Sequence, residues 1–66
     1  MKVSDFTKPE LDRFRENCNF VNDELQVFEL RSQGVTLENI AELLNLSMTS
    51  IGRASQRVNR KIKKVL

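Results

Sequence analysis

The side chains best suited to chemistry in this sequence are the basic ones near its end. Residues 47–66 carry six Lys or Arg side chains and no Asp or Glu, a net charge of +6. Residues 1–46 hold five bases and nine acids, a net charge of −4, so the overall +2 conceals a strong asymmetry. Guanidinium and ammonium groups gathered in this way favour a polyanionic partner, and nucleic-acid phosphates are the commonest one. The bases are Arg53, Arg57, Arg60, Lys61, Lys63 and Lys64.

The same sequence offers little for catalysis or metal binding. It has no His, which is the usual general base near neutral pH and the commonest metal ligand. A chain of 66 residues buries only about 60% of the surface that its unfolded form exposes, which leaves little room for a deep cleft. We therefore expect no enzymatic activity, no cofactor and no metal site.

Cys18 is the only cysteine, so no disulfide can form within the chain. We interpret it as a small buried side chain near the end of a helix. A single Cys suits a reducing cytoplasm, and no signal peptide or bilayer-spanning apolar run is recognisable. We expect a cytoplasmic protein without a membrane partner, and the starting Met1 with its early caps favours a complete chain.

Capping residues and apolar spacing predict how these groups are positioned: four helices, at about residues 8–18, 23–33, 37–44 and 48–64, and no strand. Thr7 and Glu10 have the spacing of a capping box, and Thr36 and Ser47 are good N-caps. Gly34 and Asn45 tolerate the left-handed conformation that ends a helix. The sequence thus predicts a single all-α domain over residues 1–66.

Apolar stripes predict which helix faces are buried. Leu25, Val27, Phe28 and Leu30 give the second helix a broad apolar face. The last helix buries Ile51, Val58, Ile62 and Val65, with small Ala54 and Ser55 between them. We expect every carboxylate to lie on a solvent face.

Residues 36–57 have the pattern of a helix-turn-helix, with the long last helix as the recognition helix. Ala41 is small enough for the next helix to approach closely, Leu46 fills the corner between the helices, and Ile51 anchors the second helix. A helix projected in this way fits the major groove of B-form DNA.

The stretch from Asn22 to Ser47 resembles region 4 of bacterial sigma factors. The resemblance continues through Ser50-Ile51, Arg53, Arg57 and Lys61-Ile62, and covers about two-thirds of the chain. The output domain of LuxR-type regulators is similar from Asp23 to Ile62, but it closes with a further short helix that this chain lacks. The motif is specific for the superfamily and less so for the subfamily.

The resemblance implies a bacterial or phage transcription regulator that binds double-stranded DNA. It assigns contacts with base edges to Met48, Thr49, Gly52 and Arg53, and contacts with phosphates to Ser47, Ser50 and Arg57. Gly52 has no side chain to donate a hydrogen bond, which leaves Arg53 as the best candidate for a bidentate contact with guanine. Gln56 is placed against a base or a phosphate, and Arg60 against a phosphate.

Three alternatives remain open at this point. The first alternative is a protein-interaction module that docks on RNA polymerase or an anti-sigma-type partner through its acidic half. The acidic side chains of that half include Asp5, Asp12, Glu16, Glu24, Glu29 and Glu42. RNA binding is less favoured, because the four Phe residues sit at apolar positions and offer no platform for stacked bases. The spacing of Ile51, Ser55, Val58, Ile62 and Val65 resembles a short heptad seam. Core packing explains Ile51 and Val58, whereas Ile62, Val65 and Leu66 near the free end either form a two-fold homodimer or pack on the Phe side chains of the same chain, and both are left open.

Overall fold

The computed structural model describes all 66 residues and contains no strand. Its elements are a 3₁₀ turn η1 (Val3–Asp5) and the helices α1 (Lys8–Asn17), α2 (Asp23–Ser32), α3 (Leu37–Leu44) and α4 (Met48–Val65). The prediction of a small all-α domain with four helices is confirmed, and the predicted helix ends differ from the observed ones by at most one residue. Only η1 was not foreseen.

The helix ends form where the capping residues predict them. Thr7 and Glu10 make the full capping box before α1, and the Thr36 and Ser47 hydroxyls accept the backbone N–H groups of Asn39 and Ser50. These bonds satisfy donors that have no partner inside the helix.

After α2, Gly34 takes a φ of +85°. Its N–H donates to the Arg31 carbonyl, and the Val35 N–H donates to the Leu30 carbonyl. This pair of bonds is a Schellman motif, and it needs the left-handed residue that Gly provides. Asn45 ends α3 in the left-handed region as well, at a φ of +56°.

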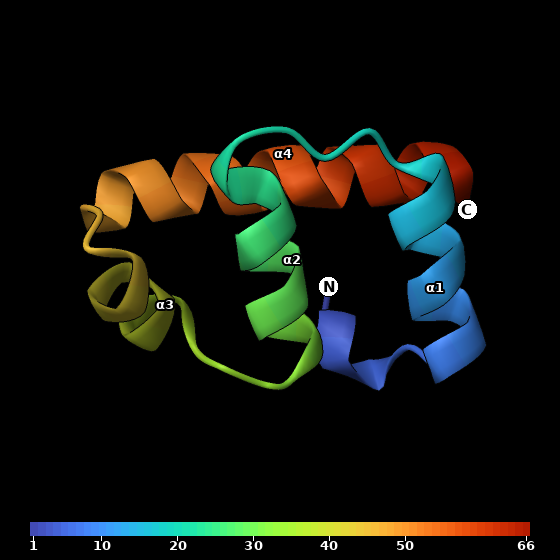
Figure 1. Cartoon of the computed structure of the whole chain (residues 1–66), viewed down its shortest axis with the longest axis horizontal. Coiled ribbons are helices and arrows are strands. Elements are labelled where there is room, and N and C mark those ends of the chain that lie inside the picture. The colour runs from blue at the N-terminus through green and yellow to red at the C-terminus, as the bar shows by residue number, and fades with distance from the viewer.

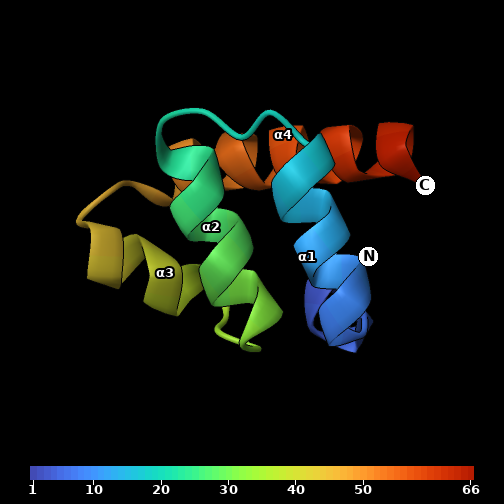
Figure 2. The same ribbon diagram turned by 45° about the vertical axis from the view of Figure 1, so that its right-hand side comes forward.

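The helix α4 runs the length of the molecule, and the other helices pack against it (Figure 1). α2 crosses it near its middle, α3 lies beside its first turns, and α1 lies beside its C-terminal half. Turning the view shows the same order, with α1 and α2 side by side in front of α4 (Figure 2). The N-terminal half of the chain thus forms a support along one side of the basic helix.

Phe28 of α2 lies at the centre of the core and is fully buried. Its ring meets Phe14 edge-on, with centroids 6.4 Å apart, and stacks on Phe20 at 4.8 Å. Val3 of η1 is also buried, so the 3₁₀ turn contributes to the same cluster. Such contacts between α1, the loop after it and α2 join the N-terminal helix to the rest of the domain.

The inner side of α4 fits the predicted stripe. Ile51, Ala54, Ser55, Val58 and Ile62 are all buried against the chain's own helices. Ile51, Ser55, Val58 and Ile62 of the heptad-spaced positions are thus covered within one chain. Val65 is half-buried and Leu66 is 69% exposed, so a homodimer through the C-terminal end of α4 stays a prediction. Cys18 is buried at the end of α1, as expected.

The face predicted for α2 needs a correction. Leu25 is 45% exposed, whereas Glu24 is 3% exposed and faces α4. The buried stripe on α2 passes through Glu24, Val27, Phe28 and the half-buried Arg31, which are spaced i, i+3, i+4 and i+7. The expectation that every carboxylate lies on a solvent face is thus wrong for Glu24.

None of the helices is both long and apolar enough to cross a lipid bilayer.

Candidate nucleic-acid interface

The start of α4 is open to solvent. The Asn45 turn and the Ser47 cap set off the helix from α3, and Ser47, Met48, Thr49 and Ser50 are all exposed. Met48 is 50% exposed, so half of an apolar side chain is available at the tip of the helix. Neighbouring segments therefore leave the first turn of α4 accessible to a partner.

The side of α4 that points away from the core is polar and basic. It contains Thr49, Arg53, Gln56 and Arg60, spaced 4, 3 and 4 residues apart, and all four are exposed. At 3.6 residues per turn this spacing keeps them on one face, opposite Ile51 and Val58. We call these four residues the outer face. None of them makes a side-chain hydrogen bond or an ion pair within the chain, so all of these side chains are available for a ligand.

Of the other predicted contact residues, Gly52 is half-buried at the edge of the outer face. A Cβ atom at this position would meet nothing within 4 Å. The Ser47 and Ser50 hydroxyls are bonded to each other at 3.1 Å, and the Ser47 hydroxyl also caps the helix. Ser47 is thus committed to the helix end in addition to any contact with a phosphate.

Arg57 differs from the outer-face bases because it is bound to α2. Its Nε donates to Oε2 of Glu24 at 2.9 Å, although the side chain remains 49% exposed. Lys61, one turn later, donates to Oε1 of Glu24 and to the Asn19 carbonyl, and its side chain is only 28% exposed. We call Glu24, Arg57 and Lys61 the Glu24 cluster.

The Glu24 carboxylate is also tied to the start of its own helix. Oε1 accepts the Val21 N–H at 3.2 Å. Burial raises the pKa of Glu24, but the hydrogen bonds from Lys61, Val21 and Arg57 lower it by more, so the net pKa lies below its ordinary value. The carboxylate is therefore ionised near neutral pH and holds both cations.

A second polar contact joins α2 to the opposite flank of α4. Nη1 of Arg31 donates to Oδ1 of Asn59 at 2.7 Å, and Nη2 donates to the Met1 carbonyl at 3.1 Å. Glu24 and Arg31 lie two turns apart on α2 and hold α4 from its two sides. Together they fix the rotation of α4 about its own axis, and hence the direction of the outer face.

The apolar pattern of the sequence does not predict the Glu24 cluster or the Arg31 contact. The sequence does contain a signal that these two charged residues lie on the buried face: Glu24 and Arg31 occupy the i and i+7 positions of the stripe that holds Val27 and Phe28. Periodicity counts apolar residues, and it treats a charged residue on the stripe as an interruption.

Glu38 and Glu42 of α3 bring negative charge close to the start of α4. Both are exposed and line a hollow of about 450 Å³ together with Met48. Arg53 is the first base on α4, one turn after this hollow. A phosphate backbone would thus be attracted to the middle of α4 more than to its tip.

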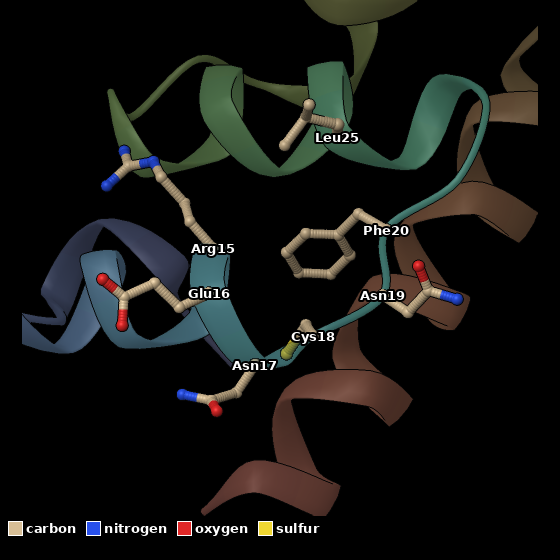
Figure 3. Close-up of a pocket in the computed structure, with 7 residues that line it drawn as sticks. All are labelled: Arg15, Glu16, Asn17, Cys18, Asn19, Phe20 and Leu25. Carbon is tan, nitrogen blue, oxygen red and sulfur yellow. The ribbon is translucent and has the colours of Figure 1, made fainter.

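Another hollow, of about 350 Å³, lies between the end of α1, the loop after it and α2 (Figure 3). Arg15, on its wall, is bound to Glu29 through Nε and Nη2 at 2.6–3.0 Å. Burial raises the pKa of the Cys18 thiol, which keeps the thiol protonated and weakly nucleophilic. The Arg15–Glu29 ion pair thus joins α1 to α2 beside this hollow.

No three His, Cys, Asp or Glu side chains lie together where they could hold a metal ion. The sequence matches no family model and no curated protein, and the fold matches no solved structure.

Proposed function

We propose that this protein binds double-stranded DNA and acts as a transcription regulator, with α4 lying in the major groove. The observation that carries the proposal is the outer face: an exposed, basic surface on a helix whose rotation is fixed by Glu24 and Arg31. A groove about 12 Å wide accepts one helix, and such a helix reads base edges only if it presents the same side chains each time.

Six exposed side chains at the start and on the outer side of α4 have distinct roles in this binding mode. Arg53 contacts guanine, with its guanidinium donating to O6 and N7, and Gln56 donates to a neighbouring base or phosphate. Met48 and Thr49, at the tip, contact base edges by apolar and hydroxyl groups. Arg57 and Arg60 neutralise phosphates, Arg57 from one flank of α4 and Arg60 from the C-terminal end of the outer face. The resemblance of residues 22 to about 66 to region 4 of sigma factors supports the same placement.

The salt dependence of DNA affinity distinguishes DNA binding from a basic surface that has no ligand. If about four phosphates are neutralised, the logarithm of the association constant falls against the logarithm of the salt concentration with a slope of about −3.6. Fluorescence anisotropy with a labelled duplex of mixed sequence, titrated from about 50 to 200 mM salt, measures that slope. A slope near zero, or no binding at low salt, contradicts the proposal.

A second candidate function is a module that docks on RNA polymerase or an anti-sigma-type partner. Acidic side chains favour it less than the sequence suggested, since Glu24 is buried and Asp12 and Glu29 are paired with Arg15. Two exposed leucines favour it instead, Leu25 at 45% and Leu43 at 66%. They line a groove of about 440 Å³ between α2 and α3 together with Gln26, Glu29, Leu30 and Leu44.

This groove lies on the side of α2 that faces away from α4. Gln26 and Glu29 point nearly opposite to Glu24 and Arg31, which contact α4. The two candidate functions thus use different surfaces, and substitutions separate them. Leu43→Ser is expected to abolish a protein contact in the groove and to leave the salt slope on DNA unchanged.

A further inference from the structure

The two cations of the Glu24 cluster use their donors differently. Lys61 gives hydrogen bonds to both Glu24 and the Asn19 carbonyl, and its side chain is mostly buried. Arg57 uses only Nε, at 2.9 Å from Oε2 of Glu24. Neither Nη nitrogen of Arg57 makes a hydrogen bond within the chain, and half of the side chain is open to solvent. Arg57 therefore has four N–H donors that make no hydrogen bond within the chain.

The position of Arg57 on α4 suits these free donors to a phosphate. Arg57 lies seven residues after Ser50, which places the two side chains two turns apart on one flank of the helix. This flank borders the outer face next to Arg53. A helix lying in a groove presents such a flank to the phosphates of one strand, whereas the N-terminal part of the outer face, with Thr49 and Arg53, meets the base edges.

We propose that Glu24 is a positioning residue for DNA binding: it holds Arg57 by Nε so that both Nη groups face one phosphate. The inference rests on the proposed function and goes beyond it by naming a buried residue that touches no DNA. A free Arg side chain loses rotamer freedom when it binds, and a side chain already held in place loses less. A guanidinium fork that is oriented beforehand also matches two phosphate oxygens at once.

The charge of Glu24 makes this proposal testable by the direction of an effect. A carboxylate near a DNA site repels phosphates. If Glu24 had no positioning role, removing its charge would therefore strengthen DNA binding or leave it unchanged. A positioning role predicts the opposite. Glu24→Gln removes the charge with little change in size, and we expect it to weaken duplex binding about threefold to tenfold.

Glu16→Gln is the matched control. Glu16 is exposed on α1 and makes no hydrogen bond or ion pair, so the change removes the same charge without affecting α4. We expect its DNA affinity to stay within about twofold of that of the unmodified chain. Circular dichroism at the assay temperature establishes that each variant is folded before its affinity is compared.

The double variant Glu24→Gln/Arg57→Ala identifies the route of the effect. If Glu24 acts through Arg57, Glu24→Gln changes affinity by less than about twofold when Arg57 is already absent. If Glu24→Gln instead destabilises the whole fold, it lowers DNA affinity by the same factor in the unmodified chain and in Arg57→Ala. That result overturns the proposal. So does a Glu24→Gln variant that binds DNA as tightly as the unmodified chain.

Arg57→Lys provides a test that does not depend on the stability of a Glu24 variant. Lysine keeps the positive charge, but an ammonium that binds Glu24 has no planar fork left for a phosphate. We expect Arg57→Lys to weaken binding nearly as much as Arg57→Ala, and full affinity in Arg57→Lys contradicts the proposal. If the unmodified chain binds no duplex at all, the proposed function itself fails, which is a separate outcome.

Discussion

Arg53 and Arg57 lie one turn apart on the same helix, yet the fold places them in different surroundings. Arg53 is exposed on the outer face without a partner in the chain, whereas Arg57 is bound to a buried carboxylate of α2. The difference arises because Glu24 of α2 lies against the flank of α4 that carries Arg57, whereas Arg53 points away from the core. In our proposal, Arg53 therefore contacts a base, whereas Arg57 is held in position to contact a phosphate.

The largest difference between the two arginines is expected in DNA selectivity. Arg53→Ala should relax sequence preference, since a bidentate contact with guanine contributes about 1–3 kcal/mol of discrimination. Arg57→Ala should weaken binding to all duplexes by a similar factor and lower the salt slope by about one.

Selection of bound duplexes from a random pool, followed by affinity measurements on selected and mixed duplexes, tests this pair of expectations. Thermal unfolding is the control: Arg53→Ala should change stability by less than about 0.5 kcal/mol. Equal loss of preference in both variants contradicts the separation of roles.

Acid should weaken the ion pair between Arg57 and Glu24, whereas Arg53 has no carboxylate partner to lose. The pKa of Glu24 is lower in the folded chain than in the unfolded one, because its partners favour the ionised form despite burial. The unfolded chain therefore binds more protons in this range, and stability rises with pH. The stabilisation by Glu24 is fully present above the ordinary pKa of glutamate, about 4.3, and is lost as pH falls through the lower folded value.

Urea unfolding measured between about pH 2 and pH 6 follows this effect. Glu10 has a lowered pKa as well, through its capping bonds with Thr7, so part of the pH dependence comes from α1. Glu24→Gln should flatten the remaining part. The same acid dependence in Glu24→Gln as in the unmodified chain would mean that the cluster contributes nothing to it.

The smallest expected effect concerns Gly52, the residue before Arg53. Gly52→Ala should raise stability by about 0.5–1 kcal/mol, because Gly is disfavoured inside a helix and a Cβ here meets nothing within 4 Å. A more stable first turn of α4 should restrict the motion of Arg53 more than that of Arg57, because Glu24 already holds Arg57.

Thermal unfolding measures the gain, and Gly34→Ala is the matched control. Gly34 has equal space around a Cβ but a φ of +85°, which an alanine adopts only with strain. Its substitution should lower stability. A loss of stability in Gly52→Ala indicates that this turn of α4 departs from a regular helix.

The sequence predicts the structure best where the physical cause is local. The caps at Thr7, Thr36 and Ser47 and the left-handed residues Gly34 and Asn45 act on backbone groups within a few positions of themselves. The helices and their ends follow from such short-range bonds, so their bounds were predictable to within one residue. The buried stripe of α4 was predictable for the same reason, since a period of 3.6 residues needs no knowledge of what covers it.

The sequence alone therefore determined the helices, their ends and the concentration of positive charge on the last of them. The tertiary structure decided which of those charges are free, because pairing depends on where α2 crosses α4. Glu24 and Arg57 are 33 positions apart, and no local pattern reports that they meet. A buried carboxylate is stable only when cations reach it, so its position on α2 reserves Arg57 and Lys61 and leaves Arg53 and Arg60 exposed.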